Sequence, residues 1–362
     1  MKNLLAGRVE VRPHLAQTVH CDVVMPGATR TPIRRRGFLK VASAFAAAGL
    51  VEPAGLFSQT AAKPRYRAAI IGHTGHGNYG HEMDLLFTDH PRVEVVAVAD
   101  PDENGRAKAA QRAKALRQYA DYKAMLEREK PELVCVAPRW TDQHDAMIHA
   151  ALESGAHVFS EKPFAQTLAE ADALLDLAKQ RSRRIVVAHQ MRLAPGILHL
   201  KSALEKGDIG ELVEMRAYGK QDSRAGGEDM LVLGVHLFDL MRFFADDAES
   251  CQARVYTKGR EITRADAHTA TEAIGPIAGD EIHAQFRFAS GVFGTFTSTA
   301  KLRQTIGHWG IELVGSKCIV RILADVFPQI LMMKAGAPEL GRARSEERRV
   351  GKECRSRWSP YH

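Results

Sequence analysis

The chain has 362 residues, of which 45% are hydrophobic and 26% are charged, with five cysteines. This composition is typical of a globular protein of about two domains, and it excludes a disordered chain, a collagen-like fibre and a disulfide-dense mini-protein. The formal net charge is +7, which taken alone suggests a nucleic-acid or anionic-membrane partner.

The excess positive charge lies at the two ends of the chain. Residues 1–62 carry eight cations against three anions, and residues 344–362 carry six cations against three anions. The segment between them, 63–343, has a net charge of −1. We therefore expect a nearly neutral folded part and no nucleic-acid partner.

Residues 1–62 have the features of an export signal. The run Arg35-Arg36-Gly37-Phe38-Leu39-Lys40 resembles the twin-arginine motif, an apolar run follows at 41–51, and Thr60-Ala61-Ala62 suits a signal peptidase. Eleven apolar residues are too few to span a bilayer, which needs about 20. The pattern predicts the twin-arginine (Tat) export machinery as a partner and a periplasmic or exported protein. A basic amphipathic helix or a membrane anchor is the alternative.

Residues 344–362 show no apolar periodicity, and they resemble the translation of a sequencing-library adapter. We expect this tail to be an artefact, with the natural chain cut off near Ala343; a disordered basic tail is the alternative. Between the two ends remain Cys135, Cys251 and Cys318, whose spacing fits neither a metal site nor a disulfide framework.

From Tyr66 onward, strand and helix patterns alternate. Strands are expected at 67–71, 93–99, 133–137, 157–160 and 185–188, and helices from the end of a glycine-rich turn to Phe87, at 103–116, at 141–153 and after a capping box of Thr167 and Glu170. Such alternation predicts a parallel, doubly wound sheet. We assign 63–190 to this dinucleotide-binding Rossmann domain.

The glycine-rich turn after the first strand has the sequence Gly72-His73-Thr74-Gly75-His76-Gly77-Asn78-Tyr79-Gly80. Glycines permit a sharp bend close to a pyrophosphate, whose charge the N–H groups of a following helix can bind. Asp100 ends the next strand and can accept from both ribose hydroxyls, whereas it would repel a 2′-phosphate. The pattern predicts NAD in preference to NADP, bound by Gly72, His73, Thr74, Gly75, His76, Gly77 and Asp100.

This turn departs from the usual G-x-G-x-x-G order, because Thr74 stands at the second glycine. A structural turn without a nucleotide is therefore the alternative. His73, His76 and His81 cluster around the turn but lack a metal-ligand spacing and an evident carboxylate or thiolate partner, so we expect no metal.

The segment 151–163, which ends in Glu161-Lys162-Pro163, resembles the Gfo/Idh/MocA oxidoreductase family. The resemblance extends from the glycine-rich turn to at least Ile322. It implies an N-terminal Rossmann domain, a C-terminal α+β domain with a large, mostly antiparallel sheet, and hydride transfer between a sugar or polyol carbon and a nicotinamide. It further implies that Pro138, Glu161 and Lys162 contact the cofactor, and that the chain forms a homo-oligomer.

Lys162 is the strongest catalytic candidate. It follows a strand of the parallel sheet, at the edge where open α/β sheets bind ligands. A cation there can lower the pKa of an alcohol or stabilise an alkoxide as the hydride leaves. The alternative is a surface lysine beside a turn.

The apolar segment 230–244 predicts a buried helix, interrupted by His236 and Asp239 on one face. Ionisable groups in such a helix need partners or a function, so both residues are catalytic candidates. The resemblance implies that His236 is a proton relay; a satisfied core histidine is the alternative. The family often has an aspartate four residues before this histidine, where this chain has Val232. Asp229, two helical turns before His236, is the candidate substitute.

The rest of the second domain, 191–343, is rich in strand patterns. Apolar and polar residues alternate over 282–288, a hairpin turn at Ser290-Gly291 leads into 292–298, and further strands are expected at 311–314 and 318–323. Lys220, Arg224 and Asp229 lie on or beside a loop before the buried helix. We expect them to contact substrate, with solvated loop charges as the alternative.

These features together predict an NAD-dependent sugar or polyol oxidoreductase. Because free NAD should be scarce outside the cytoplasmic membrane, we expect NAD to stay bound through turnover. Two alternatives remain: a redox-neutral glycoside hydrolase or epimerase that uses transient oxidation by bound NAD, and a non-catalytic NAD- or sugar-binding protein.

Overall fold

The computed structural model describes residues 9–10, 65–302, 309–325 and 328–334. The predicted export signal, apart from residues 9–10, and the whole predicted adapter tail lie outside these ranges. Within them, every helix is either too short or too polar to cross a membrane.

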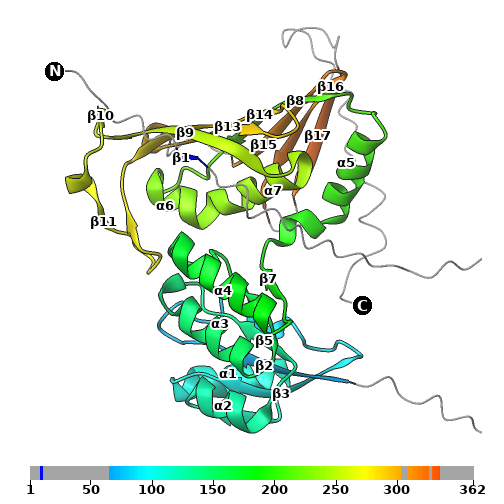
Figure 1. Ribbon diagram of the computed structural model, residues 1–362, viewed down its shortest axis with the longest axis vertical. Helices are drawn as coiled ribbons and strands as arrows, with labels where there is room; N and C mark the ends of the chain where they lie inside the picture. Colours follow the sequence, from blue (N-terminus) through cyan, green and yellow to red (C-terminus); the bar gives the residue numbers. More distant parts are fainter. Residues whose placement is uncertain (1–8, 11–64, 303–308, 326–327, 335–362) are drawn as a thin grey trace, which may run out of the picture. The chain divides into compact units, whose positions relative to one another are not determined.

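The N-terminal domain is built on a six-stranded parallel sheet with the strand order β4-β3-β2-β5-β6-β7 (Figure 1). This is the doubly wound order. The strands β2, β3 and β4 are added toward one edge of the sheet and β5, β6 and β7 toward the other, which opens a crevice between β2 and β5 at the carboxyl ends of the strands. Its strands and helices are β2 (Tyr66–Ile71), β3 (Val93–Ala99), α1 (Glu103–Ala113), β4 (Arg117–Tyr119), α2 (Tyr122–Glu129), β5 (Leu133–Val136), α3 (His144–Glu153), β6 (His157–Ser160), α4 (Leu168–Gln180) and β7 (Ile185–Val187).

The strand predictions for this sheet are confirmed to within two residues, because its central strands are apolar on both faces and buried. The sequence reasoning missed β4 and α2. Thr167 caps α4 by accepting from the N–H of Glu170, as predicted. The Glu170 carboxylate, however, accepts from the N–H of Gln166, one residue before the expected partner.

The helix predicted between the glycine-rich turn and Phe87 is wrong. Only one 3-10 turn, Met83–Leu85, forms there. Gly80 and Glu82 both have left-handed backbone conformations, with φ of 53° and 59°. Since L-residues in a right-handed helix need negative φ, these two positions prevent a regular helix from starting at the turn.

The C-terminal domain is built on a nine-stranded mixed sheet in the order β1-β9-β13-β14-β8-β15-β16-β17, with β10 paired to β9. Among the described strands of this sheet, β14 and β8 are the one pair that runs parallel. The strands are β1 (Val9–Glu10), β8 (Leu212–Tyr218), β9 (Ala248–Thr257), β10 (Arg260–Glu261), β13 (Glu281–Phe288), β14 (Phe293–Thr299), β15 (Gly310–Gly315), β16 (Cys318–Leu323) and β17 (Gln329–Lys334); β11 (His268–Thr269) and β12 (Pro276–Ile277) form a separate small sheet.

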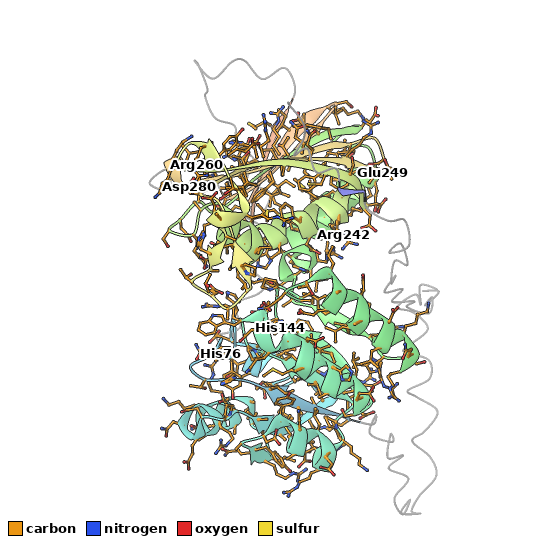
Figure 2. The ribbon with its side chains drawn as sticks, turned by 60° about the vertical axis from the view of Figure 1, so that its left-hand side comes forward. His76, His144, Arg242, Glu249, Arg260 and Asp280 are labelled. Atoms are coloured by element: carbon orange, nitrogen blue, oxygen red, sulfur yellow. The ribbon has the colours of Figure 1, made fainter. Side chains whose placement is uncertain are left out.

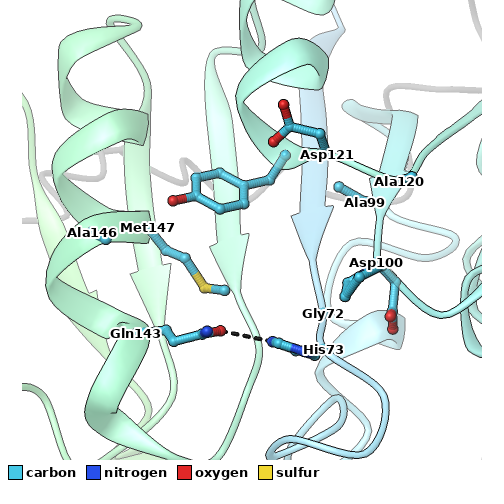
Figure 3. Close-up of a pocket in the computed structure, with 11 residues that line it drawn as sticks. Gly72, His73, Ala99, Asp100, Ala120, Asp121, Gln143, Ala146 and Met147 are labelled. Carbon is cyan, nitrogen blue, oxygen red and sulfur yellow. Dashed lines mark hydrogen bonds between the residues drawn. The ribbon is translucent and has the colours of Figure 1, made fainter.

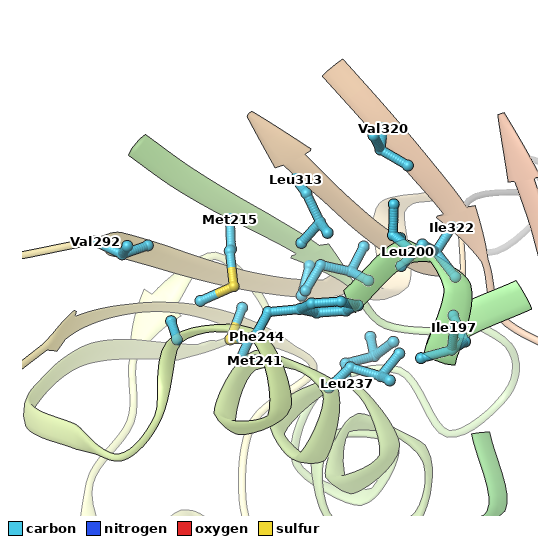
Figure 4. Packing of buried hydrophobic residues seen from close by; sticks show 14 of the residues in the cluster. Ile197, Leu200, Met215, Leu237, Met241, Phe244, Val292, Leu313, Val320 and Ile322 are labelled. Carbon is cyan, nitrogen blue, oxygen red and sulfur yellow. The ribbon is translucent and has the colours of Figure 1, made fainter. Parts of the chain in front are cut away.

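Helices α5 (Pro195–Glu205) and α7 (Val235–Ala245) pack on this sheet. Figure 4 shows Leu237, Met241 and Phe244 of α7 facing Met215 and Leu313 of the strands. Short helical segments precede α7: α6 (Gly227–Asp229) and a π-helical turn, Met230–Gly234. The buried helix predicted at 230–244 therefore exists, but its first part is π-helical. Burial of this apolar face against the sheet fixes the position of His236.

The strand β14 offers a matched pair of phenylalanines for testing this core. Phe296 is fully buried, whereas Phe293 on the same strand is 40% exposed. We expect Phe296→Ala to lower the free energy of unfolding by about 3–5 kcal/mol through lost burial and a cavity, and Phe293→Ala to cost clearly less. Urea denaturation of both variants measures the difference, and equal losses would contradict this packing.

Candidate functional site

The glycine-rich loop closes on itself immediately after β2. The backbones of His73 and Asn78 exchange hydrogen bonds of 3.2 and 2.9 Å. Gly77, with a φ of +81°, lies so close to the segment after β5 that a Cβ there would be 2.7 Å from the backbone nitrogen of Trp140. Only glycine fits this approach, so the loop packs tightly against the carboxyl end of β5.

Asp100 holds the loop on the end of β3. Its carboxylate accepts from the backbone N–H of Thr74 at 3.0 Å, from the Thr74 hydroxyl at 2.7 Å and from the N–H of Asp102 at 2.9 Å. Asp100 is buried, so the observed task of this side chain is to position the loop. Its contact with a ribose stays a prediction.

A cavity of about 260 Å³ opens at the carboxyl ends of β2 and β3 (Figure 3). Among the predicted cofactor residues, Gly72, His73 and Asp100 line it. Asp121, at the start of α2, and Met147 of α3 also contribute to the lining. Thr74, Gly75, His76, Gly77 and Pro138 lie outside the lining. The carbonyl of Pro138 accepts from Nε2 of the buried His144 at 2.7 Å.

The three histidines near the loop have partners that are distant in sequence. Nδ1 of His73 lies 2.7 Å from the Gln143 amide oxygen, as Figure 3 shows, and Nε2 of His76 lies 2.6 Å from the Asp142 carboxylate. Figure 2 labels His76 on the loop and His144 at the start of α3. These two contacts, which we call the loop clasp, join the glycine-rich loop to the segment before α3. The sequence reasoning saw no partner for these histidines, because 66 to 70 residues separate each pair.

Glu161 and Lys162 follow β6 and are both almost completely buried. The Glu161 carboxylate lies 2.6 Å from Nδ1 of His81 and also accepts from the N–H of Lys162 at 2.6 Å. The Lys162 ammonium donates to the Val232 carbonyl at 2.9 Å. This contact links the two domains at the π-helical turn, where the backbone hydrogen-bond pattern departs from that of an α-helix.

Burial lowers the pKa of Lys162, while the negative charges of Glu161 and Glu272 oppose that shift. A desolvated ammonium favours its neutral form, whereas nearby carboxylates favour the charged form. The Lys162 ammonium is therefore poised to interact with a developing negative charge rather than with bulk water.

His236, on α7, is buried beside two other aromatic rings. Its ring centroid is 5.8 Å from that of His189 and 6.3 Å from that of Trp309. Its Nδ1 is buried and has no hydrogen-bond partner among the described residues. Burial and the Lys162 charge lower the pKa of His236 to about 3, so its imidazole is neutral at ordinary pH and one ring nitrogen is free to accept.

Asp239 does share the buried face of α7 with His236, but its carboxylate is engaged elsewhere. Arg192 donates to both of its oxygens, at 2.8 and 2.6 Å. This bidentate pair ties α7 to the segment that follows β7. A catalytic role for Asp239 stays a prediction; the ion pair gives the residue a structural role that the sequence reasoning did not foresee.

The predicted substrate residues differ in their surroundings. Asp229 is fully buried and accepts from the N–H groups of Lys220 and Gln221 and from the Ser298 hydroxyl. All three groups that donate to the Asp229 carboxylate belong to the protein, and these contacts fix the loop before α6. The predicted substitution of Asp229 for the missing family aspartate is therefore not supported by its geometry.

Lys220 and Arg224 contact different residues of the site. The Lys220 ammonium lies 5.8 Å from the ring centroid of Trp309, the indole next to His236. Arg224 is paired with Asp222 and, through Nη1 at 3.3 Å, with Glu272. Glu272 also faces Nε of Arg139 at 3.4 Å, and the charges of Arg139, Arg224 and Glu272 all act on Lys162.

The sequence reasoning missed four residues of this site: Arg139, His189, Glu272 and Trp309. Arg139 and His189 follow the ends of β5 and β7, so the rule that ligands bind at the carboxyl ends of parallel strands could have identified them. Glu272 and Trp309 lie in the strand-rich domain without a local motif, and only the tertiary fold brings them to Lys162 and His236.

Comparison with known proteins identifies relatives of both domains. Residues 66–189 match a family described as an oxidoreductase family with an NAD-binding Rossmann fold, and residues 197–321 match the GFO/IDH/MocA C-terminal domain. Two similar curated proteins are D-apiose dehydrogenase of Paraburkholderia graminis, 28% identical over 57% of this chain and 56% of the relative, and myo-inositol 2-dehydrogenase of Thermotoga maritima, 27% identical over 70% and 75%. The chain thus spans little more than half the length of the first relative.

Solved structures show the same fold. An NAD-binding oxidoreductase from Klebsiella pneumoniae has a TM-score of 0.60 and 20% identity, covering 77% of this chain and 78% of its own. Levoglucosan dehydrogenase in complex with NADH and levoglucosan has a TM-score of 0.60 and 20% identity, covering 76% and 77%.

The buried, neutral state of His236 makes a testable contribution to stability. Because folding lowers its pKa from 6.5 to about 3, the unfolded chain binds more protons in that window, and stability falls as pH drops below 6.5. We expect His236→Gln to lose less stability than the wild type between about pH 8 and pH 5. Urea midpoints measure this, with the exposed His199→Gln as the control; parallel curves for wild type and His236→Gln would refute it.

Proposed function

The chain belongs to the Gfo/Idh/MocA family of oxidoreductases, and on this premise we propose that it transfers hydride between a sugar or polyol carbon and tightly bound NAD. The observation that supports this function best is the convergence of Lys162 and His236. Lys162 follows a strand of the dinucleotide-binding domain, and His236 lies on the buried helix of the second domain. The Lys162 ammonium donates to the carbonyl of Val232, four residues before His236.

The residues present fit a dinucleotide. The 260 Å³ cavity at the ends of β2 and β3 can receive the adenosine half against Gly72, His73 and Asp100. Pro138, Glu161 and Lys162 follow the neighbouring strands β5 and β6, where the nicotinamide half would be held. When bound, NAD supplies the hydride acceptor. The carboxylates of Asp100 and Asp121 at the cavity disfavour a 2′-phosphate, which supports NAD over NADP.

Lys162 and His236 have different tasks in this reaction. The Lys162 ammonium has donors beyond the one that binds the Val232 carbonyl, and these can stabilise the oxygen of the reacting hydroxyl as negative charge develops. The neutral His236 imidazole has a free ring nitrogen that can accept the hydroxyl proton. Lys162 thus stabilises the oxygen, and His236 receives the proton.

The unpartnered polar atoms near Lys162 and His236 indicate the substrate class. Nδ1 of His236, Nε1 of Trp309 and Oε2 of Glu272 are buried and make no hydrogen bond within the described ranges. The indole nitrogen can only donate and the carboxylate can only accept. Hydroxyl groups do both, so a sugar or polyol would satisfy this set; D-apiose dehydrogenase and myo-inositol 2-dehydrogenase are named for such substrates.

We further propose export by the twin-arginine route, a periplasmic location, assembly as a homo-oligomer, and retention of NAD through turnover. The loop clasp of His73 with Gln143 and His76 with Asp142 supports retention, because it fastens the glycine-rich loop beside the cofactor cavity. Retained NAD must be recycled within the site. A second substrate can reoxidise the reduced cofactor, or the oxidised form of the first substrate can take the hydride back. The latter route would give a redox-neutral hydrolase or epimerase.

A substrate screen with a lysine variant tests the function. The purified protein is assayed with sugars, polyols and glycosides, and both the absorbance of reduced nicotinamide and the products are followed. We expect Lys162→Met to lose about 100-fold or more in kcat/KM, the scale of removing a donor that stabilises a developing oxyanion. The exposed Lys123→Met serves as the control.

Four outcomes of this screen are informative. Net formation of NADH indicates a dehydrogenase, and conversion without net NADH indicates the redox-neutral alternative. No conversion of any compound would instead favour a binding protein without catalytic function and contradict the proposal. Full activity of Lys162→Met would contradict the catalytic role of Lys162.

Cofactor retention has its own test. Protein purified without added nucleotide and then denatured should release a stoichiometric amount of NAD and little NADP. Asp142→Asn should speed NAD release from the intact protein, because it weakens the clasp contact of His76. Chromatography of the released nucleotide measures both quantities, with the exposed Asp172→Asn on α4 as the control. A preparation that contains no nucleotide would refute retention.

A further inference from the structure

Residues 270–275 form a segment that we call the strap, between the short paired strands β11 and β12. Its Ala273 carbonyl accepts from the backbone N–H groups of Thr141 and Asp142 in the N-terminal domain, at 3.1 and 3.3 Å. On the other side, the N–H and hydroxyl of Thr271 donate to the buried Glu228 carboxylate. Both neighbours of Glu272 are therefore fixed, and the strap holds Glu272 in one place.

Glu272 is 7% exposed and lies between two guanidinium groups. Nη1 of Arg224 is 3.3 Å from Oε1, and Nε of Arg139 is 3.4 Å from Oε2. The second contact lacks hydrogen-bond geometry, so Oε2 remains a buried acceptor without a donor among the described residues. Nε of Arg139 is likewise buried without a hydrogen-bond partner among the described residues. A buried donor and a buried acceptor that face each other without a hydrogen bond are both costly, and a substrate hydroxyl, which can accept from one and donate to the other, would satisfy both.

Glu161 and Glu272 are the carboxylates whose charges act most strongly on Lys162. Glu161 already accepts from the Lys162 backbone and from His81. Glu272 is thus the one of the two with an acceptor to spare. Arg139 and Arg224 act on Lys162 in the opposite sense. The Lys162 charge in turn acts on the half-buried imidazole of His189 and the buried imidazole of His236.

We propose that Glu272 is a substrate-binding residue: its Oε2, which makes no hydrogen bond within the described residues, accepts one from a sugar hydroxyl next to the hydroxyl that reacts at Lys162, and the strap holds Glu272 in position. This inference rests on the proposed function, since it requires a hydroxylated substrate. The negative charge of Glu272 also favours the ammonium form of Lys162. The strap thereby couples recognition of the second hydroxyl to the charge of the residue that stabilises the reacting oxygen.

The test uses the best substrate of the screen and its analogue that lacks the neighbouring hydroxyl. We expect Glu272→Gln to raise KM about 10- to 100-fold, the scale of a lost hydrogen bond to a charged group. Removing the hydroxyl should cost the wild type a similar factor and the variant much less. The alkaline limb of the pH profile should move to lower pH in Glu272→Gln, because loss of the carboxylate further lowers the pKa of Lys162.

Two further variants keep the result interpretable. Glu281→Gln is the matched control, since the Glu281 carboxylate also lies between two basic groups, Lys301 and His283, and has no part in the site. Glu272→Asp retains the charge but shortens the reach, so KM should rise while the alkaline limb stays near that of the wild type; it carries the test if Glu272→Gln folds poorly.

The outcomes separate the two proposals. An active wild type whose KM, analogue penalty and pH profile are unchanged in both Glu272 variants would overturn the role of Glu272 alone. A wild type that contains NAD but converts no sugar would overturn the proposed function and this inference with it.

Discussion

The site depends on a buried cation. Removing the Lys162 ammonium from water is costly unless nearby groups compensate for the lost hydration. The compensation comes from the Val232 carbonyl at 2.9 Å and from the charges of Glu161 and Glu272. These groups belong to both domains, so the environment of Lys162 exists only when the two domains fold together.

Each of these three groups is held in place by different contacts. Glu161 contacts His81 and the backbone N–H of Lys162, and the Val232 carbonyl belongs to the π-helical turn. Glu272 lies on the strap, which contacts Glu228 and Thr141. The π-helical turn is informative in this respect, because such turns interrupt a helix at some energetic cost and concentrate at functional sites. Here the turn allows the helix that carries His236 to contribute a backbone acceptor as well.

The parallel sheet and the candidates Lys162 and His236 could be identified from the sequence because their signals are local. Apolar runs mark the buried strands, Lys162 follows the end of one of them, and His236 interrupts an apolar helix. Sequence reasoning failed where local preference and tertiary contact disagree. The helix expected before Phe87 does not form, because Gly80 and Glu82 adopt left-handed conformations. The contact of Asp100 with Thr74, which holds the glycine-rich loop, had no local signal. Glu272 and Trp309 had no local signal, because their significance comes only from which side chains the fold places beside them.

The charge states of Lys162 and His236 are linked. Burial, and after it the Lys162 cation, lowers the pKa of His236 to about 3, so an ammonium at 162 and an imidazolium at 236 are rarely present together. While Lys162 is charged, His236 is neutral and can accept a proton. When His236 takes that proton, the negative charge that develops on the substrate oxygen lies close to both cations and offsets their repulsion. The pair is therefore best matched to a reaction in which an oxygen gains charge as a proton leaves it, and least matched to one that begins with a neutral lysine.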